Sequence, residues 1–289
     1  MFGELVTAVT SDTVRLQGFF CQSRDAPRVS AAKGSVDAAL LVHGLGGNFY
    51  SSRLLMHVSE SLLGLGVSVL LINTRGHDMV NTLPWGGRAQ TVGAAFENVD
   101  HCRFDLSAWT EFLFERGLTN VMLVGHSLGA IKSLYAHTHV PELRIQSIIG
   151  LSATRLSYRK LIDSPEGQPL RETIQRCTSL VEAGQGTAPI AVTFPFPTWM
   201  TPQCYLDKYG PAERFNWMHF IDRIRVPTLL LFGARELQDN PVFTGLQDEL
   251  DQLQQRWLPL TIDIIPDADH FYTSRFSEVD QSLVSWLTT

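Results

Sequence analysis

Apolar positions along the chain follow two patterns. Short runs that are apolar at nearly every position predict strands buried on both faces, whereas apolar residues repeated every three to four positions predict amphipathic helices. Because the two patterns alternate, the sequence predicts a mainly parallel sheet covered by helices. The expected strands are 38–42, 67–72, 121–124, 145–151, 228–232 and 260–265. The expected helices are 54–62, 106–117, 130–135, 246–257 and 276–286.

One segment near the N-terminus differs from these buried runs. Residues 13–20 alternate, with Val14 and Leu16 on one face and Arg15 and Gln17 on the other. Such alternation is typical of an antiparallel strand with one exposed face, so we expect it near the sheet edge. A turn rich in Gly, Ser and Ala is expected between this strand and the first buried one.

A long segment interrupts the alternation of strands and helices. Residues 152–225 separate two core strands, although such connections usually take only a few residues. We therefore expect a core formed by 1–151 and 226–289, with a cap insertion at 152–225. Within the insertion, the prolines of the segment 194–200 prevent a regular helix. Its aromatic rings are expected either to line a pocket or to seal the cap onto the sheet.

Composition narrows the classes of partner and location. A chain of 289 residues that is 44% hydrophobic can bury a substantial single core. The formal charge of −6 is spread over mixed acidic and basic positions, which argues against a nucleic-acid partner or a polybasic membrane anchor. No apolar run reaches the roughly 20 residues that span a bilayer, and residues 1–10 do not resemble a secretory leader. We expect a cytoplasmic protein without stable membrane insertion.

The four cysteines predict neither a disulfide framework nor a metal site. They lie far apart in the sequence, and none forms a Cys-x-x-Cys pair. Reduced, partly buried thiols are therefore expected, with no metal and no cofactor.

The decapeptide VMLVGHSLGA at 121–130 carries the strongest chemical signal. It places Ser127 between a buried strand and a helix, where a sharp turn would expose its hydroxyl as a nucleophile. Such a turn forces the serine into an unfavourable backbone conformation, and Gly125 and Gly129 leave room where a side chain would clash. The alternative is an ordinary serine in a turn.

A serine hydroxyl needs a general base and a third group that orients that base. His270 follows the last expected strand, in a loop that opens at the same sheet edge as Ser127. After the strand 228–232, Glu236 is the preferred acid, and Asp239 is the alternative. The chain order of nucleophile, acid and base suits this assignment.

Backbone amides are the expected donors to a tetrahedral oxyanion. One is the amide of Leu128 after the nucleophile, and the other is that of Leu45 in the sequence HGLGG at 43–47. A nucleotide-binding loop is the competing interpretation of these glycines, but no Lys-Ser/Thr pair follows them. The apolar residues expected to contact a substrate are Phe49, Tyr50, Trp85, Phe194, Phe196, Trp199 and Met200.

Four motifs together resemble the α/β-hydrolase superfamily, in its esterase/lipase-like branch. They are 43–47 (HGLGG), 73–77 (NTRGH), 125–129 (GHSLG) and 269–270 (DH). The resemblance implies an eight-stranded, mostly parallel sheet, a cofactor-free Ser–acid–His mechanism, and carboxylic esters as the default substrates. Glu236 stands where that family usually has Asp. Serine at the elbow, where haloalkane dehalogenases and epoxide hydrolases carry Asp, argues against those two chemistries.

The function expected from the sequence is hydrolysis of a small-molecule ester through an acyl-enzyme on Ser127. The same residues also serve thioesterases, amidases, lactonases, C–C bond hydrolases and cofactor-independent acyltransferases, and the sequence does not separate these. A non-catalytic ligand-binding protein and an interaction protein with an aromatic docking surface also stay open at this stage.

Overall fold

A computed structural model describes residues 1–25, 36–164 and 167–288. In these residues eight strands form the main sheet, in the order β1-β2-β4-β3-β7-β8-β11-β12. Both neighbours of β2 are antiparallel to it, and the other neighbouring pairs are parallel. The mostly parallel sheet is therefore confirmed. Its strands are β1 (Glu4–Val9), β2 (Arg15–Cys21), β3 (Ala38–Val42), β4 (Ser68–Ile72), β7 (Val121–His126), β8 (Ser147–Leu151), β11 (Thr228–Gly233) and β12 (Leu260–Ile265).

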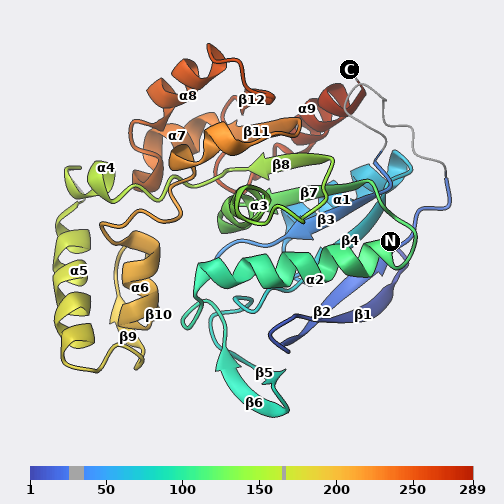
Figure 1. The fold of residues 1–289 in the computed structure, drawn as a ribbon. Helices are drawn as coiled ribbons and strands as arrows, with labels where there is room; N and C mark the ends of the chain where they lie inside the picture. Colours follow the sequence, from blue (N-terminus) through green and yellow to red (C-terminus); the bar gives the residue numbers. More distant parts are fainter. Residues whose placement is uncertain (26–35, 165–166, 289) are drawn as a thin grey trace.

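Helices cover both faces of this sheet (Figure 1). Along β3 the side chains alternate, so that Leu40 and Leu41 belong to two separate apolar clusters. One cluster is completed by α2 (Cys102–Phe114), α3 (Leu128–His139) and α8 (Leu246–Gln254). The other is completed by α1 (Arg53–Gly64) and α9 (Phe276–Thr288). The core is thus a three-layered α/β/α arrangement, as the alternating pattern predicts.

Most predicted element positions agree with the structure to within a few residues. The strands 38–42 and 260–265 are observed with the predicted bounds, and the elbow strand extends to His126 because Gly125 and His126 still pair with β8. The helix expected to end at Gly117 stops at Phe114, and Gly117 closes the following turn with a φ of 77°. The turn predicted before the first buried strand lies outside the described residues.

One predicted position needs correction. The helix expected to reach Trp257 ends at Gln254, and Trp257 is fully exposed instead of packing on the sheet. The antiparallel strand expected near the sheet edge is confirmed: residues 13–20 correspond to β2, which lies next to the outermost strand, β1. β1 was not predicted from the sequence.

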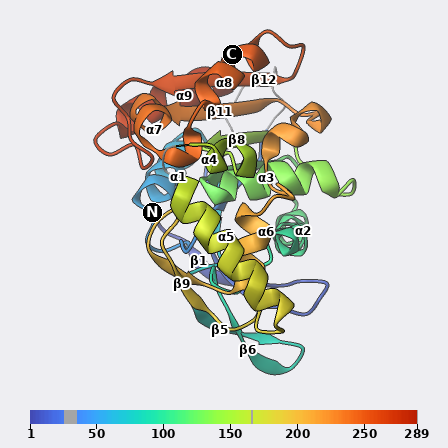
Figure 2. The same cartoon turned by 90° about the vertical axis from the view of Figure 1, so that its left-hand side faces the viewer.

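The segment between β8 and β11 builds its own small group of elements. α5 and α6 stand beside each other at one end of the sheet (Figure 1), and Figure 2 views them from that side. The proline-rich segment forms a turn and β10, which pairs with β9, while α6 begins at Pro202, a position where proline suits a helix. The elements are α4 (Tyr158–Ile162), α5 (Gly167–Glu182), β9 (Ile190–Val192), β10 (Thr198–Met200) and α6 (Pro202–Tyr209).

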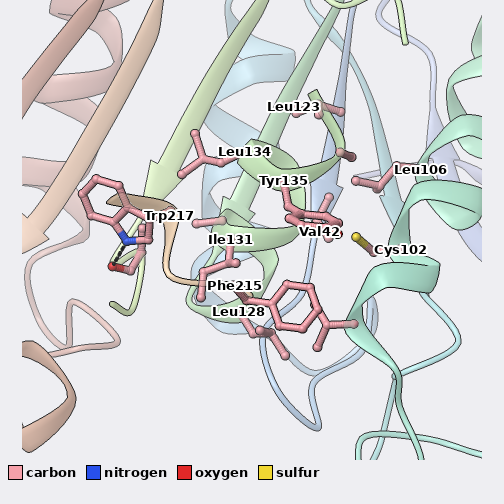
Figure 3. Close-up of a cluster of buried hydrophobic side chains, with 14 of the residues drawn as sticks. Val42, Cys102, Leu106, Leu123, Leu128, Ile131, Leu134, Tyr135, Phe215 and Trp217 are labelled. Atoms are coloured by element: carbon pink, nitrogen blue, oxygen red, sulfur yellow. Dashed lines mark hydrogen bonds between the residues drawn. The ribbon is translucent and has the colours of Figure 1, made fainter. Parts of the chain in front are cut away.

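Aromatic side chains join this segment to the core. Figure 3 shows Phe215 and Trp217 beside the residues of α3. The rings of Phe215 and Tyr135 meet edge to face, with centroids 5.1 Å apart, and the Trp217 indole N–H donates to the carbonyl of Ala153 at 3.3 Å. Burial of such large rings favours one fixed placement of the segment against α3.

The remaining elements connect the main layers. The hairpin of β5 (Asn81–Trp85) and β6 (Arg88–Val92) extends away from the main sheet (Figure 1), and α7 (Ala234–Asp239) follows β11 directly. All four cysteines are free thiols, three of them buried. No helix in the described part of the chain is long and apolar enough to cross a membrane.

Candidate active site

Ser127 occupies a strained turn between β7 and α3. Its backbone has φ 56° and ψ −122°, a conformation that costs a non-glycine residue free energy. A Cβ added to Gly125 would lie 2.3 Å from the carbonyl oxygen of Gly129. A Cβ on Gly129 would lie 2.1 Å from that of Val42. The structure therefore confirms that both flanking positions lack space for a side chain.

Ser127, His270 and Glu236 form a continuous hydrogen-bonded series. The Ser127 Oγ lies 3.0 Å from His270 Nε2, and His270 Nδ1 lies 2.7 Å from Oε2 of Glu236. In this arrangement Nδ1–H donates to the carboxylate, which leaves Nε2 free to accept the serine proton. Three residues that are far apart in the sequence thus meet at the carboxyl ends of the strands.

Buried donors hold the Glu236 carboxylate in place. Its Oε1 accepts the Gly233 N–H at 2.8 Å and the Ser152 hydroxyl at 2.7 Å, and the Tyr272 hydroxyl lies 3.0 Å from Ser152 Oγ. The alternative acid, Asp239, is exposed at the end of α7, and its carboxylate lies 4.0 Å from Arg235. The structure therefore brings Glu236, and not Asp239, to His270.

The two expected amide donors lie on the turns beside Ser127. Leu128 is the first residue of α3, so its N–H has no carbonyl partner inside the helix. Leu45 belongs to a turn in which the Gly47 N–H donates to the Gly44 carbonyl at 3.1 Å. A Cβ on Gly44 would lie 3.0 Å from the Cβ of Ser127, which shows how closely the turn approaches the serine.

Two neutral histidines support the site without serving as its base. His43 Nδ1–H donates to the Gly44 carbonyl at 2.8 Å, and its Nε2 accepts the Thr74 N–H at 3.1 Å. His126 Nε2–H donates to the backbone carbonyl of His270 at 2.8 Å. Burial, reinforced by Lys132 for His43 and by His270 for His126, lowers the pKa of each to about 3. Both rings therefore stay uncharged near neutral pH. His43 holds the backbone of Gly44 and Thr74 in place, and His126 holds that of His270.

A cavity of about 850 Å³ opens onto Ser127 and His270. Its walls are mostly apolar, which is typical of small-molecule sites. Of the residues predicted to contact substrate, Phe196 lines this cavity. The other lining residues from the insertion are Thr154, Leu156, Pro195, Lys208 and Tyr209, and those from the core include Leu45, Arg53, Leu54, Leu128, Asn240, Val242, Phe271 and Phe276.

The other predicted substrate contacts do not line this cavity. Phe194 and Met200 are buried within the insertion, where Phe194 packs edge to face on Tyr209 and Met200 ends the short hairpin. Trp199, the residue before Met200 in that strand, is 59% exposed because it points to the opposite face.

Phe49, Tyr50 and Trp85, which were also predicted to contact substrate, lie outside the cap segment and contact other side chains instead. The Tyr50 hydroxyl donates to Asp78 at 2.9 Å, and Phe49 packs edge to face on Tyr50. Trp85 lies on the β5–β6 hairpin, where its ring packs 5.0 Å from the Arg75 guanidinium. These aromatic rings stabilise loops around the site without facing the cavity.

Comparison with protein families places the chain in a known group. The model of the Alpha/beta hydrolase family matches residues 39–279. The chain belongs to the alpha/beta hydrolase family. Family membership supports hydrolase activity and fits the strand order and the elbow already described. A search of curated proteins found no match.

Solved structures share the fold of this alpha/beta hydrolase at low sequence identity. The alpha/beta hydrolase GrgF from Penicillium sp. sh18 has a TM-score of 0.69 and 13% identity, and the match covers 99% of this chain and 98% of GrgF. Est1E from Butyrivibrio proteoclasticus, solved with ferulic acid, has a TM-score of 0.64, 14% identity and 97% coverage of both chains. The Pyrococcus furiosus esterase Pf2001 has a TM-score of 0.62 and 18% identity, with 99% of this chain and 90% of that chain covered.

A buried ion cluster in this alpha/beta hydrolase was not predicted from the sequence. Lys132 Nζ lies 2.5 Å from Glu97 Oε1 and donates to the Thr74 hydroxyl at 3.0 Å. Lys208 Nζ lies 3.8 Å from Glu97 Oε2. Burial alone would raise the pKa of Glu97, but the two ammonium groups outweigh it and hold that pKa below its usual value. The one signal in the sequence is a lysine, Lys132, within the apolar helix after the elbow.

Within the described ranges, no group of three His, Cys, Asp or Glu side chains is arranged to hold a metal ion.

Proposed function

We propose that the protein is a serine hydrolase that cleaves carboxylic esters of small molecules through an acyl-enzyme on Ser127. The observation that carries the proposal is the series Ser127–His270–Glu236, with contacts of 3.0 and 2.7 Å at the wall of an apolar cavity. A hydroxyl paired with an imidazole that is oriented by a buried carboxylate is suited to nucleophilic attack.

In the first half of the reaction, His270 Nε2 takes the Ser127 proton while Oγ attacks the ester carbonyl carbon. The carbonyl oxygen becomes an oxyanion, which the amides of Leu45 and Leu128 stabilise. The imidazolium is stabilised by Glu236 and returns its proton to the leaving alcohol as the C–O bond breaks. Water, deprotonated by His270, then attacks the acyl-enzyme and releases the acid, restoring the Ser127 hydroxyl.

We also propose that residues 152–225 form a cap over this site. Pro195, Phe196, Lys208 and Tyr209 belong to that segment and line the same cavity as Ser127. The acyl or alcohol part of the substrate would therefore lie between cap and core. The name of the Pyrococcus furiosus esterase Pf2001, which shares the fold, accords with ester substrates.

The proposal is tested by treating the protein with a fluorophosphonate and measuring intact mass, followed by peptide mapping. We expect one adduct per chain, located on Ser127. In a panel of esters, thioesters, amides and lactones, we expect the esters to be hydrolysed fastest. A folded protein that gains no adduct and cleaves no ester would contradict the proposal. If thioesters, amides or lactones are cleaved faster than esters, Ser127 remains the proposed nucleophile, but the proposed substrate class is wrong.

Glu236→Asp is expected to lower kcat for the best ester by about 10- to 100-fold, because a shorter side chain moves the carboxylate away from His270. The shorter carboxylate cannot keep both the contact to His270 and the contacts to Gly233 and Ser152. Initial rates over a range of ester concentrations give the change.

The matched control is Asp239→Asn, which changes a carboxylate on the same short helix. Because Asp239 is exposed and distant from the series, its variant is expected to retain the wild-type kcat. A large loss in Asp239→Asn with little change in Glu236→Asp would reverse the assignment of the acid.

A further inference from the structure

The charges on the cavity wall are all of one sign. Among the described residues that line the cavity, Arg53 and Lys208 are the cationic side chains, and none is Asp or Glu. This positive wall contrasts with the net charge of −6 of the whole chain. A cavity with low-dielectric walls and charges of one sign concentrates the opposite charge in its ligand.

Lys208 brings a buried charge that its surroundings do not fully compensate. Lys208 and Lys132 share the single carboxylate of Glu97, so the cluster of three carries one excess positive charge. The side chains of all three are almost completely excluded from solvent. A buried charge without a full partner is costly, so an anion placed beside this cluster would be strongly favoured.

The other ionised groups around Lys208 balance one another. Asp207 is paired with Arg214 at 2.6 Å, and Asp100 is paired with Arg103 at 2.5 Å. These two ion pairs contribute no net negative charge. Asp12 and Asp105 share Arg75 and carry one excess negative charge, which acts on Lys132. Lys208, 3.8 Å from Glu97, is therefore the less compensated ammonium of the cluster.

The Lys208 ammonium also has a donor to spare. An ammonium group has three N–H donors. Two of them reach the backbone carbonyls of Glu97 at 2.8 Å and Ala94 at 3.3 Å. The Glu97 Oε2 atom, at 3.8 Å, is beyond hydrogen-bond distance. Within the described residues the third N–H makes no hydrogen bond, and Glu97 Oε2, the carboxylate oxygen beside it, has no hydrogen-bond partner either. A ligand carboxylate next to Lys208 would accept from this third donor.

Arg53 adds a second cation, on the core side of the cavity. It is the first residue of α1, whose first turn contains no acidic residue, and a positive charge at a helix N-terminus is unfavourable. In the part of the chain that the structure describes, no carboxylate lies within ion-pair distance of its guanidinium. A cation in this position costs helix stability, which is consistent with a role in binding an anion.

We propose that the substrate is an ester that carries a second, ionised carboxylate, which binds Lys208 inside the cavity and is attracted by Arg53. This inference rests on the proposed ester hydrolysis at Ser127 and narrows its substrate class to monoesters of dicarboxylic acids. The acyl chain occupies the apolar part of the cavity, and the free carboxylate compensates the charge of Lys208.

Matched substrates test the carboxylate directly. Monomethyl adipate and methyl hexanoate have the same acyl length, and only the first carries a carboxylate. With the wild-type protein in a pH-stat, we expect kcat/KM for monomethyl adipate to exceed that for methyl hexanoate by at least about tenfold, the value of one charged hydrogen bond. Equal rates, or faster cleavage of methyl hexanoate, would overturn the inference while leaving the hydrolase proposal intact.

Variants of Lys208 and Arg53 test whether these two residues cause the preference for the ester with a free carboxylate. Lys208→Met is expected to lower the adipate-to-hexanoate ratio by about tenfold or more, and Arg53→Gln by about two- to fivefold because it is exposed. Arg88→Gln removes an exposed cation from the β5–β6 hairpin, away from the cavity, and should keep the wild-type ratio. A ratio that is unchanged in both Lys208→Met and Arg53→Gln overturns the assignment.

Calorimetry keeps the inference testable if Lys208→Met does not fold or if neither ester is cleaved. Adipate should bind the wild-type protein at least about tenfold more tightly than hexanoate, and Arg53→Gln should weaken that difference. Equal binding of the two acids overturns the inference. Tight adipate binding without fluorophosphonate labelling of Ser127 would support the anion site and contradict the hydrolase proposal.

Discussion

Replacing Ser127 by alanine is expected to lower the rate of ester hydrolysis by about 10⁴- to 10⁶-fold while the fold remains intact. The substitution removes the one oxygen that lies 3.0 Å from His270 Nε2. It adds no backbone strain, because alanine, like serine, carries a Cβ at the positive φ of the elbow. Initial rates on the best ester measure the loss, and circular dichroism with thermal unfolding checks the fold.

Ser133→Ala is the matched control for this experiment. Ser133 lies in the same helix, α3, and its hydroxyl is buried and donates to the carbonyl of Gly129 at 2.9 Å. The same loss of a buried hydroxyl is expected to leave the hydrolysis rate within about twofold of wild type, since Ser133 contacts no reacting group. If Ser127→Ala keeps wild-type activity, another residue must be the nucleophile.

The features predicted best from the sequence are those fixed by local patterns. An uninterrupted apolar run as short as 38–42 is typical of a strand that a sheet buries on both faces, so its strand could be located from sequence alone. The elbow at Ser127 was likewise predictable, because its glycines are required by contacts within a few residues or with the adjacent strand. The parallel order follows from alternating elements.

The sequence favoured Glu236 as the acid but could not exclude Asp239. Glu236 and Asp239 lie three residues apart in a short helix and are neighbours on its surface, so which carboxylate reaches His270 depends on how α7 is placed. The Gly233 N–H and the Ser152 hydroxyl, which determine the orientation of Glu236, come from separate parts of the chain. The choice between Glu236 and Asp239 therefore depends on tertiary contacts, which the local sequence does not reveal.

The substrate contacts were the least predictable part of the site. An aromatic segment such as 194–200 shows that a large apolar surface must be covered, but not whether a ligand or the protein covers it. In the structure Phe194 packs on Tyr209, and Phe196 lines the cavity. Lys208, which also lines it, gave no sequence signal because its partner Glu97 lies in a distant loop.

Glu97→Gln is expected to reduce the free energy of unfolding by about 3–5 kcal/mol, because it leaves two ammonium groups buried without an anionic partner. Glutamine has nearly the same volume as glutamate, so a new cavity cannot be the cause. The amide can still accept one hydrogen bond from Lys132, but it supplies no negative charge to either lysine. Urea unfolding at neutral pH, followed by circular dichroism, measures the change.

Glu111→Gln is the control, since Glu111 is exposed on α2 and the same substitution there should change stability by less than about 0.5 kcal/mol. The comparison isolates the cost of removing a carboxylate from a buried cluster. A loss below about 1 kcal/mol in Glu97→Gln would mean that the lysines are solvated or lose their charge at little cost. The excess charge proposed to bind a substrate carboxylate would then be compensated by the protein itself, so this stability measurement also tests the electrostatic basis of that site.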